Sequence, residues 1–179
     1  MTTTYEEHVP YSSRCPPPQA PPPIAGAWSD AEYQRIWLRT QSRAWGTLAV
    51  VPADDRTPTY EVARLIAALG LHHGELVRMA DLRDVRPGRV GAFLEVAAEL
   101  VNRGERVVFA TCSVSENLAT IPLARAADGV ILCVSIGSTS IRRIEETIEV
   151  VGKDRFLGSM LIRDPAAAVA RSSALAPPD

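Results

Sequence analysis

The sequence predicts an α/β domain, a three-layer, doubly wound, mostly parallel sheet covered by helices. One observation is that short apolar runs alternate along the chain with segments of helical periodicity. The second is that these runs are continuous in Val, Ile and Leu, as expected where helices cover both faces of a sheet. A chain of 179 residues with 46% hydrophobic residues has enough apolar material for one such core.

Five strands and five helices account for this pattern. The predicted strands are 47–51, 75–79, 106–111, 129–136 and 156–162. The predicted helices are one capped by Ser29 or Asp30, with Ile36 and Trp37 on its apolar side, then 59–69, 90–103, a short one near Pro122, and 138–151. In the last helix, Ile141, Ile144, Ile148 and Val151 are predicted to face inward.

The predicted domain spans residues 29–164 and lies between two tails. Residues 1–28 include the run PYSSRCPPPQAPPPIAG and are predicted to be a disordered, Pro-rich tether or a docking peptide. Residues 165–179 form a second, short tail. We expect a cytoplasmic protein without a direct membrane span, because no run is long and apolar enough and the start lacks a signal-peptide pattern.

Ligands of such sheets bind beyond the carboxyl ends of the strands. The first of these loops, 52–59, joins a strand to a helix, which is where a phosphate loop of the form G-x-x-x-x-G-K-[ST] is placed. Here the loop reads PADDRTPT, and the single lysine of the chain is the distant Lys153. Asp54 and Asp55 would repel a triphosphate, and Pro58 has no backbone donor.

Several segments carry a family resemblance. They read LRTQ at 38–41, MADLR at 79–83, ATCS at 110–113, AADGVILCVSIGST at 126–139 and FLGSMLIRD at 156–164. Together they resemble the cytoplasmic kinase domain of bacterial tyrosine kinases, which are relatives of Min-type ATPases and regulate capsule and exopolysaccharide synthesis. The resemblance implies a fold like that of the P-loop nucleotide hydrolases, in a degenerate form.

The residues that carry the family's chemistry are replaced. The first aspartate of the family's second motif aligns with Met79, and that of the third motif aligns with Ala110. Without these carboxylates Mg²⁺ has no evident ligands, so we expect no catalytic residue, no metal site and no cofactor. Arg56, Thr59 and Asp81 are the remaining residues that could contact a nucleotide.

Two arginine pairs are candidate partner-binding residues. The family's oligomerisation motif, Glu-x-x-Arg-x-x-Arg, is partly present, because Glu32 and Arg35 fit and Arg39 comes one residue late. This resemblance allows a homo-oligomer. Arg142 and Arg143 are predicted on the outer face of the last helix, which is either a solvated surface or a second partner surface.

Other classes of function lack support in the sequence. A net charge of −2 with intermixed signs gives no footprint for nucleic acid. The three cysteines form no C-x-x-C pair, and Cys133 is predicted in the core. His72–His73 has no nearby ligand at metal spacing, and Ser113 and Ser115 lack a G-x-S-x-G context, which disfavours a serine hydrolase.

The resemblance and its losses together predict a catalytically inactive kinase-like or ATPase-like protein. It would be a regulatory or scaffolding partner in bacterial exopolysaccharide synthesis, of a capsule or a cellulose-like polymer. The expected partner is a membrane-embedded polysaccharide synthase or co-polymerase, bound at the inner face of the membrane. Two alternatives remain: an active tyrosine kinase that binds nucleotide through Arg56, and a degenerate Min-type protein that positions a pilus or flagellum.

Overall fold

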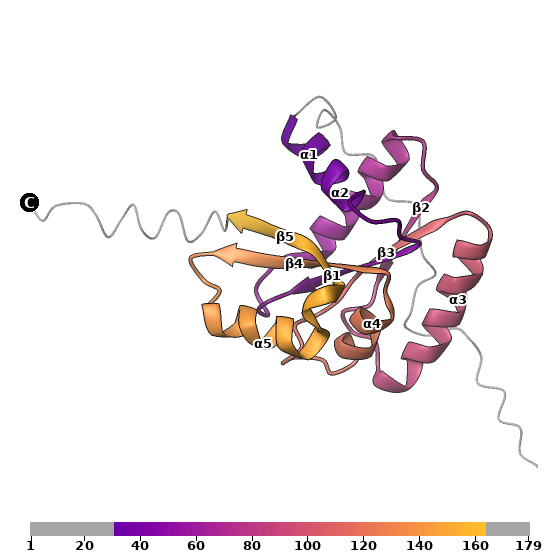
Figure 1. Cartoon of the computed structure of the whole chain (residues 1–179). Coiled ribbons are helices and arrows are strands. Elements are labelled where there is room, and N and C mark those ends of the chain that lie inside the picture. The colour runs from indigo at the N-terminus through magenta and orange to yellow at the C-terminus, as the bar shows by residue number, and fades with distance from the viewer. Residues whose placement is uncertain (1–30, 164–179) are drawn as a thin grey trace, which may run out of the picture.

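The computed structural model describes residues 31–163, without the side chains of residues 32 and 33, and places helices on both faces of a five-stranded sheet (Figure 1). All four strand pairings are parallel, and the strand order is β2-β3-β1-β4-β5. The strands are β1 Thr47–Pro52, β2 Val77–Asp81, β3 Arg106–Ala110, β4 Gly129–Ile136 and β5 Phe156–Arg163. The predicted α/β class and parallel sheet are confirmed.

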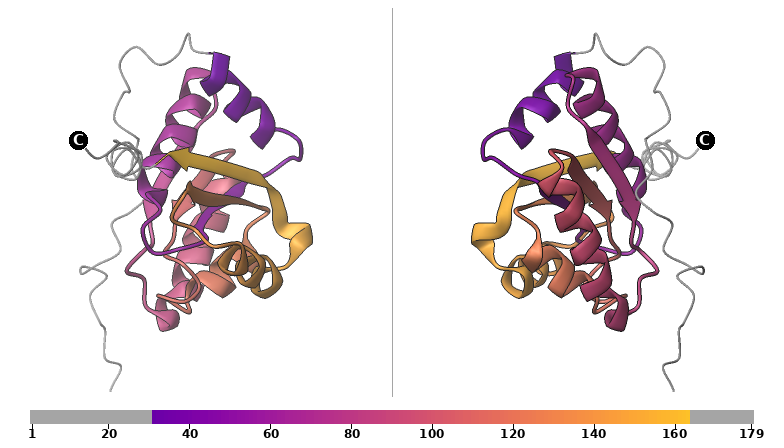
Figure 2. Two further views of the ribbon diagram at one scale, coloured as in Figure 1. Left: turned by 90° about the vertical axis from the view of Figure 1, so that its left-hand side faces the viewer. Right: turned by 90° about the vertical axis from the view of Figure 1, so that its right-hand side faces the viewer.

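The helices divide between the two faces of the sheet (Figure 2). They are α1 Ala31–Thr40, α2 Thr59–His72, α3 Val90–Asn102, α4 Thr120–Ala126 and α5 Ile141–Val151, with short 3₁₀ turns η1 Pro87–Arg89 and η2 Lys153–Arg155. One face is covered by α1 and α2, and the other by α3, α4 and α5. No helix between residues 31 and 163 is long and apolar enough to cross a bilayer.

The central strand β1 contributes residues to the hydrophobic cores on both faces of the sheet. Leu48 and Val50 pack toward α1 and α2, where the rings of Trp37 and Trp45 meet edge to face at 6.3 Å. Ala49 and Val51 pack on the opposite side with the residues of α3 and α4. Each of the two faces of β1 is therefore buried, which explains its continuous apolar sequence.

The chain changes direction at β1, and this places the loops. From β1 it crosses to the side of β2 and β3, then returns to β4 and β5 on the other side. The loops after β1, β3 and β4 therefore meet beyond the carboxyl end of the central strand, which is the usual ligand position in open α/β sheets.

Some predicted boundaries were wrong near helix ends. The strand β2 begins at Val77, two residues later than predicted, because the amide of Glu75 donates to the carbonyl of Gly70 and closes α2. The first helix ends at Thr40, whose hydroxyl donates to the Trp37 carbonyl at 2.7 Å. Its predicted caps, Ser29 and Asp30, lie outside the described residues, as do both predicted tails.

The start of α5 also differs from the prediction. The helix begins at Ile141, and the Ser140 hydroxyl caps it by accepting from the Arg143 amide. Ile141 was predicted to face inward but is 74% exposed, because it stands in the first turn, ahead of the residues that reach the sheet. Ile144 and Ile148 do pack there, and Val151 is buried as predicted.

Candidate functional site

The turn between β1 and α2 is organised around the carboxylate of Asp54, which is only 5% exposed. One carboxylate oxygen accepts from the Arg56 amide and from the Thr57 hydroxyl, each at 3.0 Å. The other accepts from the hydroxyl of Thr139, in the loop after β4. The Thr57 hydroxyl also contacts the hydroxyl of Ser135 at 3.0 Å, so the first and fourth strand loops are joined through one buried polar network.

These bonds keep the Asp54 carboxylate charged. Burial alone would raise its pKa, but the hydrogen bonds from Thr139, Thr57 and the Arg56 amide, with the charge of Arg143, lower the pKa below its ordinary value of 3.8. The turn therefore carries an internal negative charge at neutral pH. The position at which the family binds phosphate contains the protein's own anion.

The backbone donors of the turn are also used internally. The Ala53 amide donates to the Cys133 carbonyl at 2.9 Å, the Thr57 amide to the Asp54 carbonyl at 3.4 Å, and the Thr59 amide to the Thr57 carbonyl at 2.9 Å. Pro58 has no amide hydrogen. Because a phosphate loop works by turning free amides toward the phosphate, this turn has few donors to offer one.

Thr59 stands where the family has its metal-binding serine or threonine, but it has another contact. Its hydroxyl donates to the Thr111 carbonyl at 2.8 Å, and the residue is 2% exposed. Thr59 thus ties the start of α2 to the end of β3. Arg56 does lie at a pocket of about 430 Å³, but Asp54 and Asp55 line the same pocket.

Arg143 belongs to this turn and not to the outer face of α5. Its guanidinium lies 3.7 Å from one carboxylate oxygen of Asp55. The other oxygen of Asp55 accepts from the hydroxyls of Ser113 and Ser115. The prediction that both arginines cover the outer face was wrong for Arg143. It was correct for Arg142, which is exposed and forms the predicted ion pair with Glu146 at 2.7 Å.

Asp81, at the end of β2, is neutralised locally. Two nitrogens of the Arg83 guanidinium donate to its two oxygens at 2.8 and 2.7 Å. Burial raises the pKa of Asp81, but the bonds from Arg83 outweigh this and lower it. The same guanidinium lies 5.1 Å from the ring centroid of Tyr60, and Arg83 accepts the thiol of Cys112 on its carbonyl oxygen. Burial raises the pKa of that thiol to about 12.

The residues that align with the family's two metal-binding aspartates are buried. Met79 is 7% exposed and Ala110 is fully buried, so the positions of the family's two aspartates are now part of the apolar core. Within residues 31–163 there is no group of three His, Cys, Asp or Glu side chains that could hold a metal ion. His73 stacks on the Trp37 ring at 5.6 Å and contacts Gln34 at 2.8 Å, a packing role that the sequence did not indicate.

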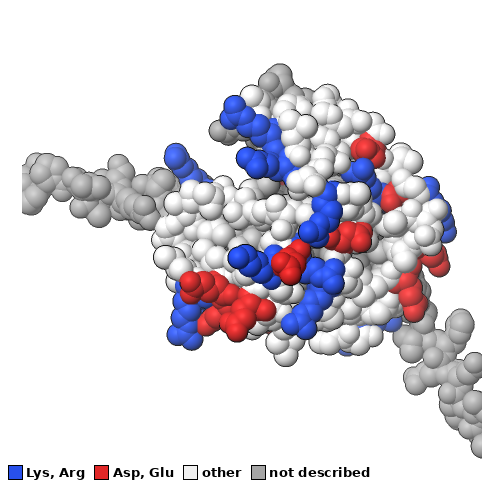
Figure 3. All heavy atoms as spheres, viewed as in Figure 1, with Lys and Arg blue, Asp and Glu red and all other residues white. Residues whose placement is uncertain are grey.

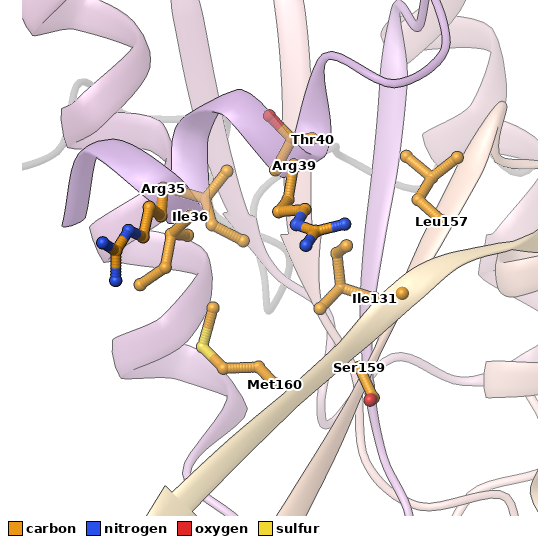
Figure 4. A pocket seen from close by; sticks show the side chains of 10 residues that line it. Arg35, Ile36, Arg39, Thr40, Ile131, Leu157, Ser159 and Met160 are labelled. Atoms are coloured by element: carbon orange, nitrogen blue, oxygen red, sulfur yellow. The ribbon is translucent and has the colours of Figure 1, made fainter. Parts of the chain in front are cut away.

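A second region involves the other predicted arginine pair. Arg35 and Arg39 of α1 line a groove of about 370 Å³ whose opposite wall is β5. Its apolar lining includes Ile36, Ile131 and Met160 (Figure 4). In Figure 3, basic side chains over α1 border a hollow next to β5, while acidic side chains gather over α5. Sequence reasoning named the arginines but did not detect the groove, since β5 comes from the far end of the chain.

Comparison with known proteins supports the fold. No protein-family model and no curated protein matches the chain. A solved structure described as the chimerical protein CapA2B2 is similar, with a TM-score of 0.56 and 10% sequence identity, over 74% of this chain and 82% of that chain. At this identity the similarity shows the fold alone: the chain is built like CapA2B2.

Proposed function

We propose that this protein is a nucleotide-independent partner protein that regulates or scaffolds bacterial exopolysaccharide synthesis from the cytoplasmic face of the membrane. The observation that carries the proposal is the Asp54 network. Its carboxylate takes the hydroxyl and amide donors of a turn where a nucleotide hydrolase would bind phosphate. A protein that has this sheet but lacks the nucleotide chemistry can still act by binding other proteins through its surface.

The biological context of the proposal rests on two similarities. The segments LRTQ, MADLR and AADGVILCVSIGST resemble the capsule tyrosine kinases. The fold is shared with the chimerical protein CapA2B2. By the family resemblance the partner is a membrane-embedded polysaccharide synthase or co-polymerase, reached through exposed arginines such as Arg35, Arg39 and Arg142.

Isothermal titration calorimetry of the full chain with Mg·ATP and Mg·ADP tests the central claim. We expect no binding heat, because Asp54 and Asp55 repel the phosphates and the turn amides are already bonded. Binding at micromolar or lower concentration would overturn the proposal. Phosphotransfer to a partner tyrosine that is lost in Arg56→Ala would establish the kinase alternative instead.

The partner claim needs a separate measurement. The tagged full chain is used to isolate complexes from detergent-solubilised membranes of cells that make the polymer. Recovery of polysaccharide synthase or co-polymerase subunits supports the proposal, provided that Arg35→Glu with Arg39→Glu reduces it. Recovery of pilus or flagellar components alone contradicts it.

A further inference from the structure

The strand β5 forms an open edge of the sheet. Within residues 31–163 it pairs with β4 alone, in parallel register from Val130–Phe156 to Ile136–Arg163. Its sequence FLGSMLIR has no proline and no charge before Arg163. Proteins usually protect edge strands with proline, charge or a covering segment, because the outer row of backbone donors and acceptors can pair with another chain. Within the described residues nothing pairs with the outer side of β5.

One face of this edge is basic. On the side of α1, the groove places Arg35 and Arg39 above an apolar surface that includes Met160 (Figure 4). Neither guanidinium takes part in any ion pair or hydrogen bond among the side chains that the structure describes. Two exposed cations beside an apolar wall favour a ligand that brings negative charge to this face.

On the opposite face of the same edge, Leu161 stands between Ser159 and Arg163 and exposes apolar surface. Leu161 pairs with Val134, a residue of the α5 side, and is 65% exposed. Ile136 at the end of β4 is 42% exposed and Ile141 at the start of α5 is 74% exposed. The carboxyl end of the β4–β5 pair thus has large apolar side chains in contact with solvent, where α5 does not cover β5.

Successive side chains of a strand point to opposite faces of its sheet. A segment added beside β5 therefore directs alternate side chains toward the side of Arg35 and Arg39 and toward the side of Leu161. We propose that β5 binds an extended segment of a partner protein in which acidic and apolar residues alternate, added as a sixth strand. A second copy fits less well, since pairing through β5 would bring the arginines of both copies to the same face.

This inference rests on the proposal that the protein acts through protein contacts, but it is tested without nucleotide, so the two can fail separately. The probe is a capped peptide of alternating glutamate and valine, with eight residues to match β5. The full chain carries ¹³C-methyl methionine. Met160 lines the groove, whereas Met79 is 7% exposed on the far strand β2 and serves as the internal control.

We expect the Met160 signal to shift with saturation and the Met79 signal to remain in place. Arg35→Glu with Arg39→Glu weakens binding by about tenfold or more, while Arg86→Glu with Arg89→Glu, at two other exposed positions, does not. Leu161→Glu also weakens binding, whereas Leu76→Glu, at a residue 61% exposed elsewhere, leaves it unchanged. A peptide of the same composition with the glutamates in one block binds at least tenfold more weakly.

Several outcomes would overturn the proposal. One is equal binding of the alternating and block peptides, and another is unchanged binding after reversal of Arg35 and Arg39. If Glu6→Lys with Glu7→Lys shifts Met160 in the full chain without peptide, the occupant is the chain's own N-terminal segment. If the chain forms a dimer that Leu161→Glu dissociates, the occupant is a second copy.

Discussion

The carboxylates of the turn after β1 are hydrogen-bonded within the protein, whereas the arginines of the groove between α1 and β5 are exposed to solvent. Asp54 and Asp55 at the turn are bonded to hydroxyls from two other loops. Arg35 and Arg39 at the groove have no ion pair among the described side chains. Charges that are hydrogen-bonded within the protein stabilise the fold, whereas exposed charges without such partners can bind another molecule. This difference is the reason why we propose the edge of the sheet, and not the turn, as the binding surface.

Removing the Asp54 carboxylate should have the largest effect, because it removes the acceptor of the bonds that hold the turn. Asp54→Ala leaves the Thr57 and Thr139 hydroxyls and the Arg56 amide without their acceptor, in a site that is 5% exposed. We expect the free energy of unfolding to fall by about 3 kcal/mol, as measured by chemical denaturation. Asp84→Ala, at an exposed position, is the control, and an equal effect of both variants would contradict the network.

A side chain at Gly70 should disturb the packing of α1, the helix that carries the arginines of the groove. A Cβ at this position of α2 would collide with the Val77 side chain and approach the Trp37 ring to 3.0 Å, which disturbs the seat of α1. Gly70→Ala should destabilise the protein by about 2 kcal/mol in thermal denaturation. Gly91→Ala in α3 meets no atom within 4 Å and should instead stabilise it by about 0.5 kcal/mol.

Acid titration sharpens the comparison, because the turn contains groups that protonate and the arginines of the groove do not. The folded-state pKa values of Asp54 and Asp81 lie below the ordinary 3.8. Their contribution to stability is therefore present above about pH 4 and is lost as the pH falls through the lowered values. In urea denaturation between about pH 5 and 2.5, Asp54→Asn should show a shallower loss than the wild type. Parallel curves would show that Asp54 is not stabilised as a carboxylate.

The two neighbouring arginines of α5 give the smallest effects. Arg143→Ala removes the ion pair with Asp55 and should lower stability by about 0.5 kcal/mol, because the pair is half-exposed. Arg142→Ala removes an exposed pair with Glu146 and should leave the denaturation midpoint unchanged. A larger loss of stability in Arg142→Ala than in Arg143→Ala would contradict the contact between Arg143 and the turn.

The sheet could be predicted from the sequence because its strands are buried on both faces. Continuous apolar runs such as 47–51 and 129–136, bounded by polar turns, are typical of strands in a covered parallel sheet. The absence of a G-x-x-x-x-G-K-[ST] pattern after the first strand was also readable, since Gly and Lys are either present there or not. The Asp54 network was not, because its partner Thr139 lies 85 residues away and joins it through tertiary structure.

The edge groove could not be predicted for a similar reason. Helical periodicity placed Ile36 and Trp37 on the apolar side of α1, and the family's oligomerisation motif pointed to Arg35 and Arg39, but neither could tell which strand these arginines face. The misplacement of Arg143 has a local cause. Arg143 lies in the first turn of α5, where a long guanidinium reaches back over the preceding loop, and a helical wheel treats it as outward.

The central place of β1 has a consequence for how the chain folds. Its two neighbours are β3 and β4, and the residues that pair with it begin at Val107 and Gly129. The strand that supplies both cores therefore cannot be completed until most of the domain has emerged from the ribosome. Such non-local parallel pairing makes folding slow. During synthesis, an apolar strand with two open edges would be exposed, and this segment is where we expect chaperones to bind the nascent chain.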